Sequence, residues 1–286
     1  MWKNAARRAL CGALLGLLCL AAAGAPATAK KPAGGFWSSI QFHYKAKDLD
    51  AAIERFLRLQ TPEQMFGKAP AVRLLRQRAL VVFFASAFQN QPKQVLKASR
   101  AAAKTGNDIQ LFILADAVAK TKIPDRDKAL ELLLAASARH PNSKPGPARD
   151  KLFAAVRQGQ FRDYGKLPIA NAVDMDVLWH VFFATGDPAL VARIAANLKF
   201  WLPREKLAAR LKALEPKVKS DPEAGREMVA LVLGNTAARS LYAYGRQHAR
   251  VRAVLSKMAE KRTDKTGKVA KSILASITSQ KKKSAK

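Results

Sequence analysis

The feature that most restricts the fold is a helix stop-and-start pattern that recurs along the chain. Residues 105–108 (TGND) and 185–188 (TGDP) place a glycine directly before Asn or Asp. Glycine adopts the left-handed conformation that ends many helices, and Asn or Asp caps the next one. A cap followed by proline also occurs at 61–63 (TPE) and 221–223 (DPE), and proline suits the first helical position. This punctuation predicts helices joined by turns of a few residues.

The segments between these turns have helical periodicity. In residues 48–60, Leu49, Ile53, Phe56 and Leu57 fall on one helical face. Further helices are predicted at 70–88, 92–104, 108–120, 124–140 and 148–158. Because no run of alternating β-branched residues occurs, a sheet is not expected. Short turns make neighbouring helices pack antiparallel, so we predict an all-α fold of antiparallel helical hairpins.

An internal repeat indicates how the hairpins are arranged. The tetrapeptide VFFA at 82–85 recurs at 181–184, and each copy precedes a turn, a proline and a helix rich in small residues. Together with the shared turn chemistry, this favours hairpins stacked as an irregular α-solenoid without a strict period. The predicted helical-hairpin domain covers residues 48–278, and the proline-rich loop 141–147 is a candidate subdivision.

The N-terminus predicts export. Lys3, Arg7 and Arg8 precede an apolar run at 9–23, and the small-residue triplet Ala-Thr-Ala ends at Ala29. This order is typical of a signal peptide, so we predict one over residues 1–29, followed by a flexible leader at 30–47. The mature chain is then periplasmic or secreted. An uncleaved membrane anchor is the less favoured alternative, since a spanning helix needs about 20 apolar residues.

Several kinds of chemistry are disfavoured by residue usage. Both cysteines, Cys11 and Cys19, lie within the predicted signal peptide, which leaves no thiol for a disulfide, a nucleophile or a metal site. No two histidines have metal-ligand spacing, and no nucleophile elbow or phosphate-binding glycine loop occurs. We therefore predict no catalytic residues, no cofactor and no metal, and a protein that is not an enzyme.

The chain is strongly basic, with 51 Lys and Arg against 21 Asp and Glu and a net charge of +30. Such an excess attracts anions. Nucleic acid is not expected outside the cytoplasm, where phospholipid head groups, lipopolysaccharide phosphates, acidic polymers and acidic proteins are the available anions. A compositional drift towards Arg and Ala codons explains the charge equally well.

The candidate binding residues lie near the C-terminus. Arg239, Tyr242, Arg246 and Arg250 follow three- and four-residue steps and share one helical face unless Gly245 breaks the helix. Arginine beside tyrosine can bind phosphates and stack on flat groups. The full candidate set for an anion or partner is Arg239, Tyr242, Arg246, Arg250, Arg252, Lys281, Lys282 and Lys283. The alternative is a basic face that only keeps the protein solvated.

The last eight residues, 279–286 (SQKKKSAK), are predicted to form a disordered lysine-rich tail. Lysine runs of this kind are attracted to anionic membranes. The preceding segment, 269–277, predicts a short amphipathic helix that either attaches to a surface or caps the domain.

Two clusters before the basic region have competing interpretations. Asp174 and Asp176, with Asp163, form either a carboxylate pair or cation site, or else helix caps and favourable charges at a helix start. Residues 179–198, with Trp179 and His180, mark either a pocket or a turn between two helices. In both clusters the structural interpretation is favoured.

The pattern DMDVLW at 174–179 running into FFATGD at 182–187, with GNTAARSL at 234–241 and Gln247-His248, resembles uncharacterised exported bacterial proteins. The resemblance covers roughly residues 170–252. It implies an all-helical, degenerate tetratricopeptide-like repeat protein without an assigned activity. The basic C-terminal extension is not part of it.

These observations predict an exported, non-enzymatic protein-interaction module with partners in the cell envelope. The alternative is an anion-binding envelope protein that attaches to phospholipid, lipopolysaccharide or an acidic polymer through its basic C-terminal face. A cell-wall hydrolase is less favoured, because it would need Asp163, Asp174 and Asp176 to converge. The sequence leaves the partner and the oligomeric state open.

Overall fold

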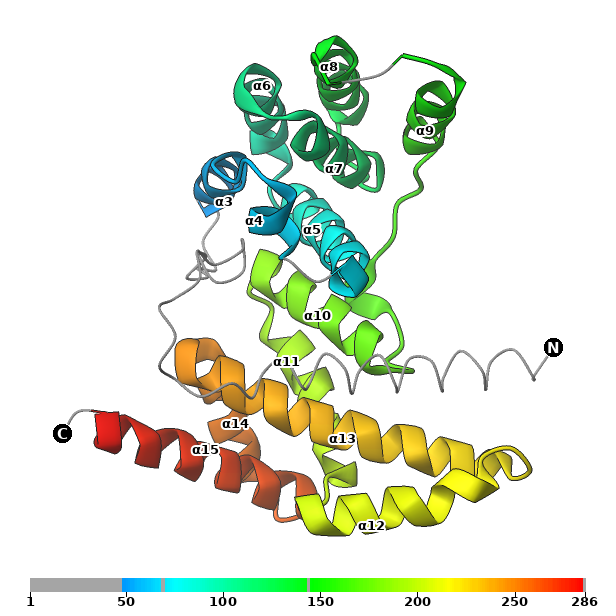
Figure 1. Cartoon of the computed structure of the whole chain (residues 1–286). Coiled ribbons are helices and arrows are strands. Elements are labelled where there is room, and N and C mark those ends of the chain that lie inside the picture. Colours follow the sequence, from blue (N-terminus) through cyan, green and yellow to red (C-terminus); the bar gives the residue numbers. More distant parts are fainter. Residues whose placement is uncertain (1–47, 68–69, 143–144, 285–286) are drawn as a thin grey trace. The chain divides into compact units, whose positions relative to one another are not determined.

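The computed structural model describes residues 48–67, 70–142 and 145–284 (Figure 1). Within these ranges the chain forms thirteen α-helices and short 3-10 turns, and it contains no strand. The all-α prediction is confirmed. The predicted signal peptide and leader lie outside the described residues. None of the helices in the described ranges is both long enough and apolar enough to cross a lipid bilayer.

The chain divides into two compact units. The first unit comprises the described residues up to Lys166 together with His180–Gly186, and the second comprises Leu167–Trp179 and the residues from Asp187 onward. Helix α10 (Ala172–Thr185) therefore contributes to both. The division does not lie at the loop 141–147, where the sequence placed its candidate subdivision.

The first unit contains seven further helices, whose bounds are α3 (Asp48–Leu57), α4 (Pro62–Phe66), α5 (Pro70–Asn90), α6 (Val95–Thr105), α7 (Asp108–Ala119), α8 (Arg126–Arg139) and α9 (Pro147–Arg157). Helix α5 contacts α7, α6 contacts α8, and α7 packs closely on α8. The core includes a fully buried aromatic cluster, in which the Phe84 ring lies 5.0 Å from Phe56 and 5.1 Å from Phe83.

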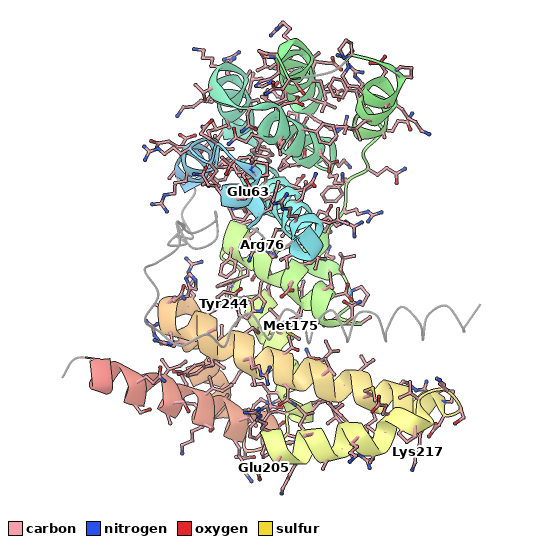
Figure 2. The ribbon with its side chains drawn as sticks, viewed as in Figure 1. Glu63, Arg76, Met175, Glu205, Lys217 and Tyr244 are labelled. Atoms are coloured by element: carbon pink, nitrogen blue, oxygen red, sulfur yellow. The ribbon has the colours of Figure 1, made fainter. Side chains whose placement is uncertain are left out.

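Side chains at the helix ends explain where these elements begin and how they are joined. Asn107 accepts a hydrogen bond from the Gln110 N–H at 3.0 Å, and the Gln110 side chain accepts one from the Asn107 N–H at 2.9 Å. This reciprocal cap starts α7 as predicted. Short α4 is held to α5 by an ion pair from Arg73 to Glu63 at 2.7 Å and by Arg76, which donates to the Phe66 carbonyl at 2.8 Å (Figure 2).

The predicted turn at 185–188 is also confirmed. Helix α10 ends at Thr185, Gly186 has a φ of 71°, and the next helix, α11 (Pro188–Ala195), begins immediately. The Asp187 carboxylate accepts a hydrogen bond from the Ala189 N–H at 2.8 Å. Gly186 and Asp187 are therefore the stop and the start of two helices, which accounts for this part of the TGDP segment without a ligand.

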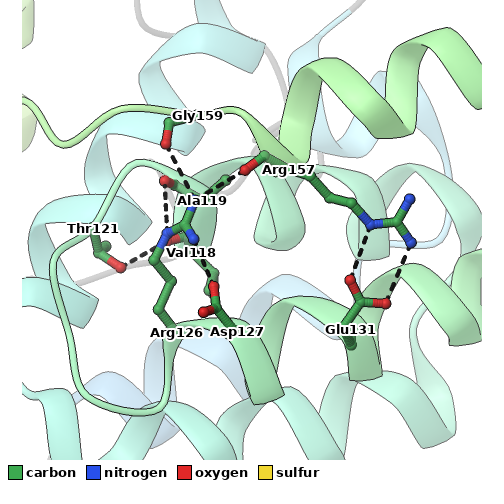
Figure 3. Close-up of polar contacts among 8 residues, drawn as sticks. All are labelled: Val118, Ala119, Thr121, Arg126, Asp127, Glu131, Arg157 and Gly159. Carbon is green, nitrogen blue, oxygen red and sulfur yellow. Dashed lines mark hydrogen bonds and ion pairs between the residues drawn. The ribbon is translucent and has the colours of Figure 1, made fainter.

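Arg126 connects the ends of three helices in the first unit (Figure 3). Its Nε donates to the Ala119 carbonyl at 3.2 Å, and its Nη2 donates to the carbonyls of Arg157 and Gly159 at 3.1 Å each. Its Nη1 pairs with Asp127 at 2.6 Å. Because these bonds join the C-terminal ends of α7 and α9 to the start of α8, α9 belongs to the first unit despite the loop 141–147.

The second unit contains α11, the 3-10 turn η3 (Ala196–Phe200), α12 (Arg204–Leu214), α13 (Pro222–Gln247), α14 (Ala249–Lys261) and α15 (Lys265–Ser284). Helix α13 contacts η3, α14 and α15, and α14 packs closely on α15 (Figure 1). Two glycines of α13 permit these approaches. A Cβ at Gly234 would lie 2.6 Å from the carbonyl carbon of Phe200, and one at Gly245 would lie 2.7 Å from the Ile277 Cδ1.

Near the C-terminus the structure decides one open question and corrects one expectation. Gly245 does not break its helix, since α13 continues to Gln247 and Gly245 serves the contact with α15. Residues 279–284, predicted to be disordered, continue α15 to Ser284. Val269, Ile273 and Ile277 are buried at four-residue spacing, so packing fixes the body of α15. Each added residue then extends a formed helix at little cost, and lysine is a good helix former.

Candidate functional site

An open groove of 570 Å³ lies in the second unit, between α13 and α15. Buried Ala238 on α13, with Val269 and Ile273 on α15, supplies apolar lining. Trp201, which follows η3, also lines the groove. The volume falls within the roughly 300–1,000 Å³ typical of ligand pockets.

The α13 side of the groove carries a cation and an aromatic ring. Arg239 and Tyr242 are three residues apart and both line it, as the sequence predicted for a shared face. Arg239 is exposed, and no acidic side chain within the described ranges forms an ion pair with it. Its guanidinium therefore has donors to offer to an anionic group.

The α15 side is a row of small polar side chains. Ser272, Ser276 and Ser279 line the groove at four- and three-residue spacing, and Gln280 lies one residue further. The Ser276 hydroxyl donates to the Ser272 carbonyl, and the Ser279 hydroxyl donates to the Ser276 carbonyl, at 3.0 Å each. Because each hydroxyl proton is used within the helix, the oxygen lone pairs remain as acceptors for a ligand.

The other predicted residues are distributed differently. Arg246 is exposed on α13 but does not line the groove, whereas Arg250 and Arg252 are on α14. Arg252 donates to the Gly245 carbonyl at 2.8 Å, so it satisfies the C-terminal end of α13. The backbone of Lys281, Lys282 and Lys283 belongs to α15, and their side chains lie outside the described part of the structure. The predicted single face is thus divided between two helices at His248.

Sequence analysis missed half of the groove. The serines at 272, 276 and 279 have the spacing of one helical face, so the sequence does contain a signal for them beside the apolar stripe of Val269, Ile273 and Ile277. Trp201 gave no such signal, because its place beside α13 depends on the close approach at Gly234.

Asp174, the first of the two carboxylates before Trp179, is used at the start of α10. Asp174 accepts hydrogen bonds from the N–H groups of Ala170 and Asn171 at 2.9 and 3.1 Å, and the Asn171 side chain accepts one from the Asp174 N–H at 3.0 Å. This reciprocal arrangement starts α10 and accounts for Asp174. Asp163 is ion-paired with Lys166 at 3.1 Å.

Asp176 has a different environment within the second unit. Although it keeps an accessible surface, desolvation by the surrounding protein raises its pKa from 3.8 to about 6. Its charge also acts on Tyr244 of α13 (Figure 2), whose pKa is raised to about 12, mainly by burial. The Tyr244 ring lies 4.6 Å from that of Trp179 and 6.2 Å from that of His248. Trp179 is therefore part of the packing that surrounds Tyr244.

We expect Asp176→Asn to stabilise the second unit at neutral pH. A raised pKa means that the ionised carboxyl is less favourable in the folded protein, so stability falls as the pH rises from about 4 through about 6. Because Asp176 is solvent-accessible, the gain at pH 7 should not exceed about 1 kcal/mol. Urea unfolding at pH 4, 6 and 8 measures it. If the difference in the free energy of unfolding between variant and parent is the same at all three pH values, the raised pKa of Asp176 is contradicted.

No protein-family model, no curated protein and no solved structure matches the chain.

Proposed function

We propose that this chain is an exported, non-enzymatic binding module that holds an acidic polysaccharide in the groove between α13 and α15. The observation that carries this proposal is the exposed Arg239, which has no ion-pair partner in the described ranges and lies beside Tyr242 opposite the serine row. Arg239 supplies donors for a carboxylate, sulfate or phosphate group. The aromatic rings supply flat surfaces on which the apolar faces of sugar rings can lie.

The serine row favours a hydroxyl-bearing polymer over a phospholipid head group or a bare polyanion. Ser276 and Ser279 offer oxygen acceptors that match sugar hydroxyl donors and would repel a second anionic group. A surface suited only to electrostatic attachment would need no such acceptors. The net charge of +30 adds long-range attraction for an acidic chain, which screening by salt reduces.

The packing of the first unit is consistent with a scaffold of stacked helical hairpins. Contacts of α5 with α7 and of α6 with α8 join helices two apart in the chain, as successive repeats of an irregular α-solenoid would. In this proposal the scaffold gives the protein its rigidity and the second unit binds the polymer. Export follows from the N-terminal segment predicted to be a signal peptide.

The test is calorimetric titration of the full chain with polygalacturonate, dextran, polyphosphate and anionic phospholipid vesicles. We expect polygalacturonate to bind most tightly. Arg239→Gln should weaken that binding about tenfold, since a charge-assisted hydrogen bond contributes roughly 1.5–3 kcal/mol. Arg246→Gln is the matched control, because it removes the same charge from the same helix outside the groove. It should change the affinity less than about twofold.

Three outcomes would overturn the proposal. Equal losses in the two arginine variants would mean that general charge attracts the polymer. A preference for vesicles or polyphosphate would assign the site to a different anion. Capture of an envelope protein that withstands both high salt and Arg239→Gln would favour the protein-interaction alternative.

A further inference from the structure

The first unit contains a separate open pocket of 230 Å³. Its lining comes from four parts of the unit. They are the C-terminal part of α5 (Ala85, Ser86, Gln89 and Asn90), Lys120 directly after α7, the segment 161–165, and Val181 and Thr185 of α10. Its volume is below the roughly 300–1,000 Å³ of pockets for drug-sized ligands. A ligand here must therefore be small.

Phe161 is the most unusual residue of this lining. It is 47% exposed, and it is the one aromatic residue among the large apolar side chains that are exposed in the described ranges. Its neighbours Arg162 and Asp163 are also exposed. A half-exposed phenyl ring in the lining of this pocket offers an apolar surface to a ligand that is itself partly apolar.

Planar polar side chains converge on the same pocket. Arg162 and Asn90 line it, and no hydrogen bond or ion pair to the side chain of either is found within the described part of the chain. Asp163 retains a second carboxylate oxygen beside the one that pairs with Lys166. The Arg162 and Asn90 side chains each present two polar atoms in one plane, and Asp163 adds one further acceptor, which suits neighbouring hydroxyls on one ligand.

The remainder of the pocket is held in place. The Gln89 side chain accepts from the Lys122 N–H at 2.8 Å and donates to the Lys122 carbonyl at 3.2 Å, which fixes the end of α5. Ser86 lies one helical turn earlier, buried and lining the pocket. Tyr164 is buried between these elements, and its pKa is raised by that burial and by Asp116. This part of the lining is thus pre-formed, which lowers the entropy lost on binding.

We infer that this pocket binds a single sugar residue, with one ring face on Phe161 and vicinal hydroxyls on Arg162, Asp163 and Asn90. A carbohydrate combines the three properties that the lining calls for: small size, an apolar face and a dense set of hydroxyls that both donate and accept. The inference concerns a different unit from the polymer groove and does not depend on it.

Saturation-transfer NMR on the full chain tests the site. The probes are the methyl glycosides of glucose, galactose, mannose and N-acetylglucosamine, together with glucuronate, each at about 5 mM to detect millimolar binding. We expect saturation of the ring protons of at least one probe, and competition among the probes that bind. Absence of transfer to all five would overturn the inference.

Two variants and two controls assign any binding to the pocket. Phe161→Ala and Arg162→Gln should each lower the transfer at least about fivefold. Leu152→Ala removes an apolar side chain that is 48% exposed elsewhere in the first unit, and Arg139→Gln removes an exposed arginine there. Both controls should retain binding, as should Arg239→Gln in the polymer groove. Binding that survives Phe161→Ala and Arg162→Gln would refute the assignment, whatever the fate of the polymer groove.

Discussion

Replacing Gly234 with alanine is expected to lower the free energy of unfolding of the second unit by about 2–3 kcal/mol. The new Cβ would lie 2.6 Å from the carbonyl carbon of Phe200 and 2.7 Å from the Trp201 nitrogen. These are backbone atoms, so relief requires η3 and α13 to move apart rather than a side chain to rotate. That movement would also shift Trp201 away from the groove.

Gly225→Ala is the matched control for this prediction. It makes the same change in the same helix, but its Cβ would meet only the Val218 Cγ1, at 3.9 Å. Alanine is better than glycine in a helix by roughly 0.5–1 kcal/mol, so this variant should be stabilised. Trp179 and Trp201 both belong to the second unit. With Trp2 and Trp37 replaced by phenylalanine in every protein compared, tryptophan fluorescence during urea unfolding follows that unit. The prediction fails if the two variants shift the midpoint in the same direction.

Local chemistry explains why most helices could be predicted. The sequence places helices at 108–120 and 124–140, and the structure has α7 at Asp108–Ala119 and α8 at Arg126–Arg139. Their caps and apolar faces depend on residues only a few positions away, so a single sequence contains the information. The turn at Gly186 and Asp187 is predictable for the same reason.

The features that sequence analysis missed depend on distant residues. Glycine in mid-helix is ordinarily a weak point, so the sequence left open whether Gly245 interrupts the helix. In the structure a glycine is needed at this position because Ile277, more than thirty positions away in the chain, occupies the space that a Cβ would fill. The groove likewise depends on distant residues, since it lies between α13 and α15, whose lining residues are far apart in the chain.

The predicted basic face also depended on a feature that local spacing does not reveal, namely where its helix ends. Regular spacing predicted one helical face for Arg239, Tyr242, Arg246 and Arg250. In the structure, however, α13 ends between Arg246 and Arg250, where a side chain takes over the hydrogen bonding of its C-terminal carbonyls. Arg252 provides such a donor at the Gly245 carbonyl, and α14 begins after His248. Two of the predicted residues thus line the groove, and one of the others is used to end the helix that carries them.

Arg126→Ala is expected to destabilise the first unit by about 3 kcal/mol, because one side chain satisfies carbonyls at the ends of two helices. Ala119, whose carbonyl bonds to the Arg126 Nε, is fully buried, so water cannot readily replace that donor. An unsatisfied buried carbonyl costs about 1–3 kcal/mol. The carbonyls of Arg157 and Gly159 lose a charged donor as well.

Arg126→Lys separates the geometry of the guanidinium from its charge. An ammonium is a point donor that cannot reach carbonyls on both sides of the fork, so lysine should restore less than half of the lost stability. Arg157→Ala is the control for removing an arginine nearby. Its side chain forms a solvent-exposed pair with Glu131, at 2.9 Å, and such pairs contribute at most about 1 kcal/mol.

Urea unfolding followed by circular dichroism measures the three variants, and hydrogen exchange locates the effect. In Arg126→Ala, amides of α9 should exchange faster than those of α5, because Arg126 joins α9 to α7 and α8 while the aromatic cluster holds α5. If Arg126→Ala and Arg157→Ala are equally stable, the carbonyls at the ends of α7 and α9 do not need Arg126. If α9 and α5 lose protection together, α9 is an integral part of the core, and Arg126 contributes to the stability of the whole unit rather than to the attachment of one helix.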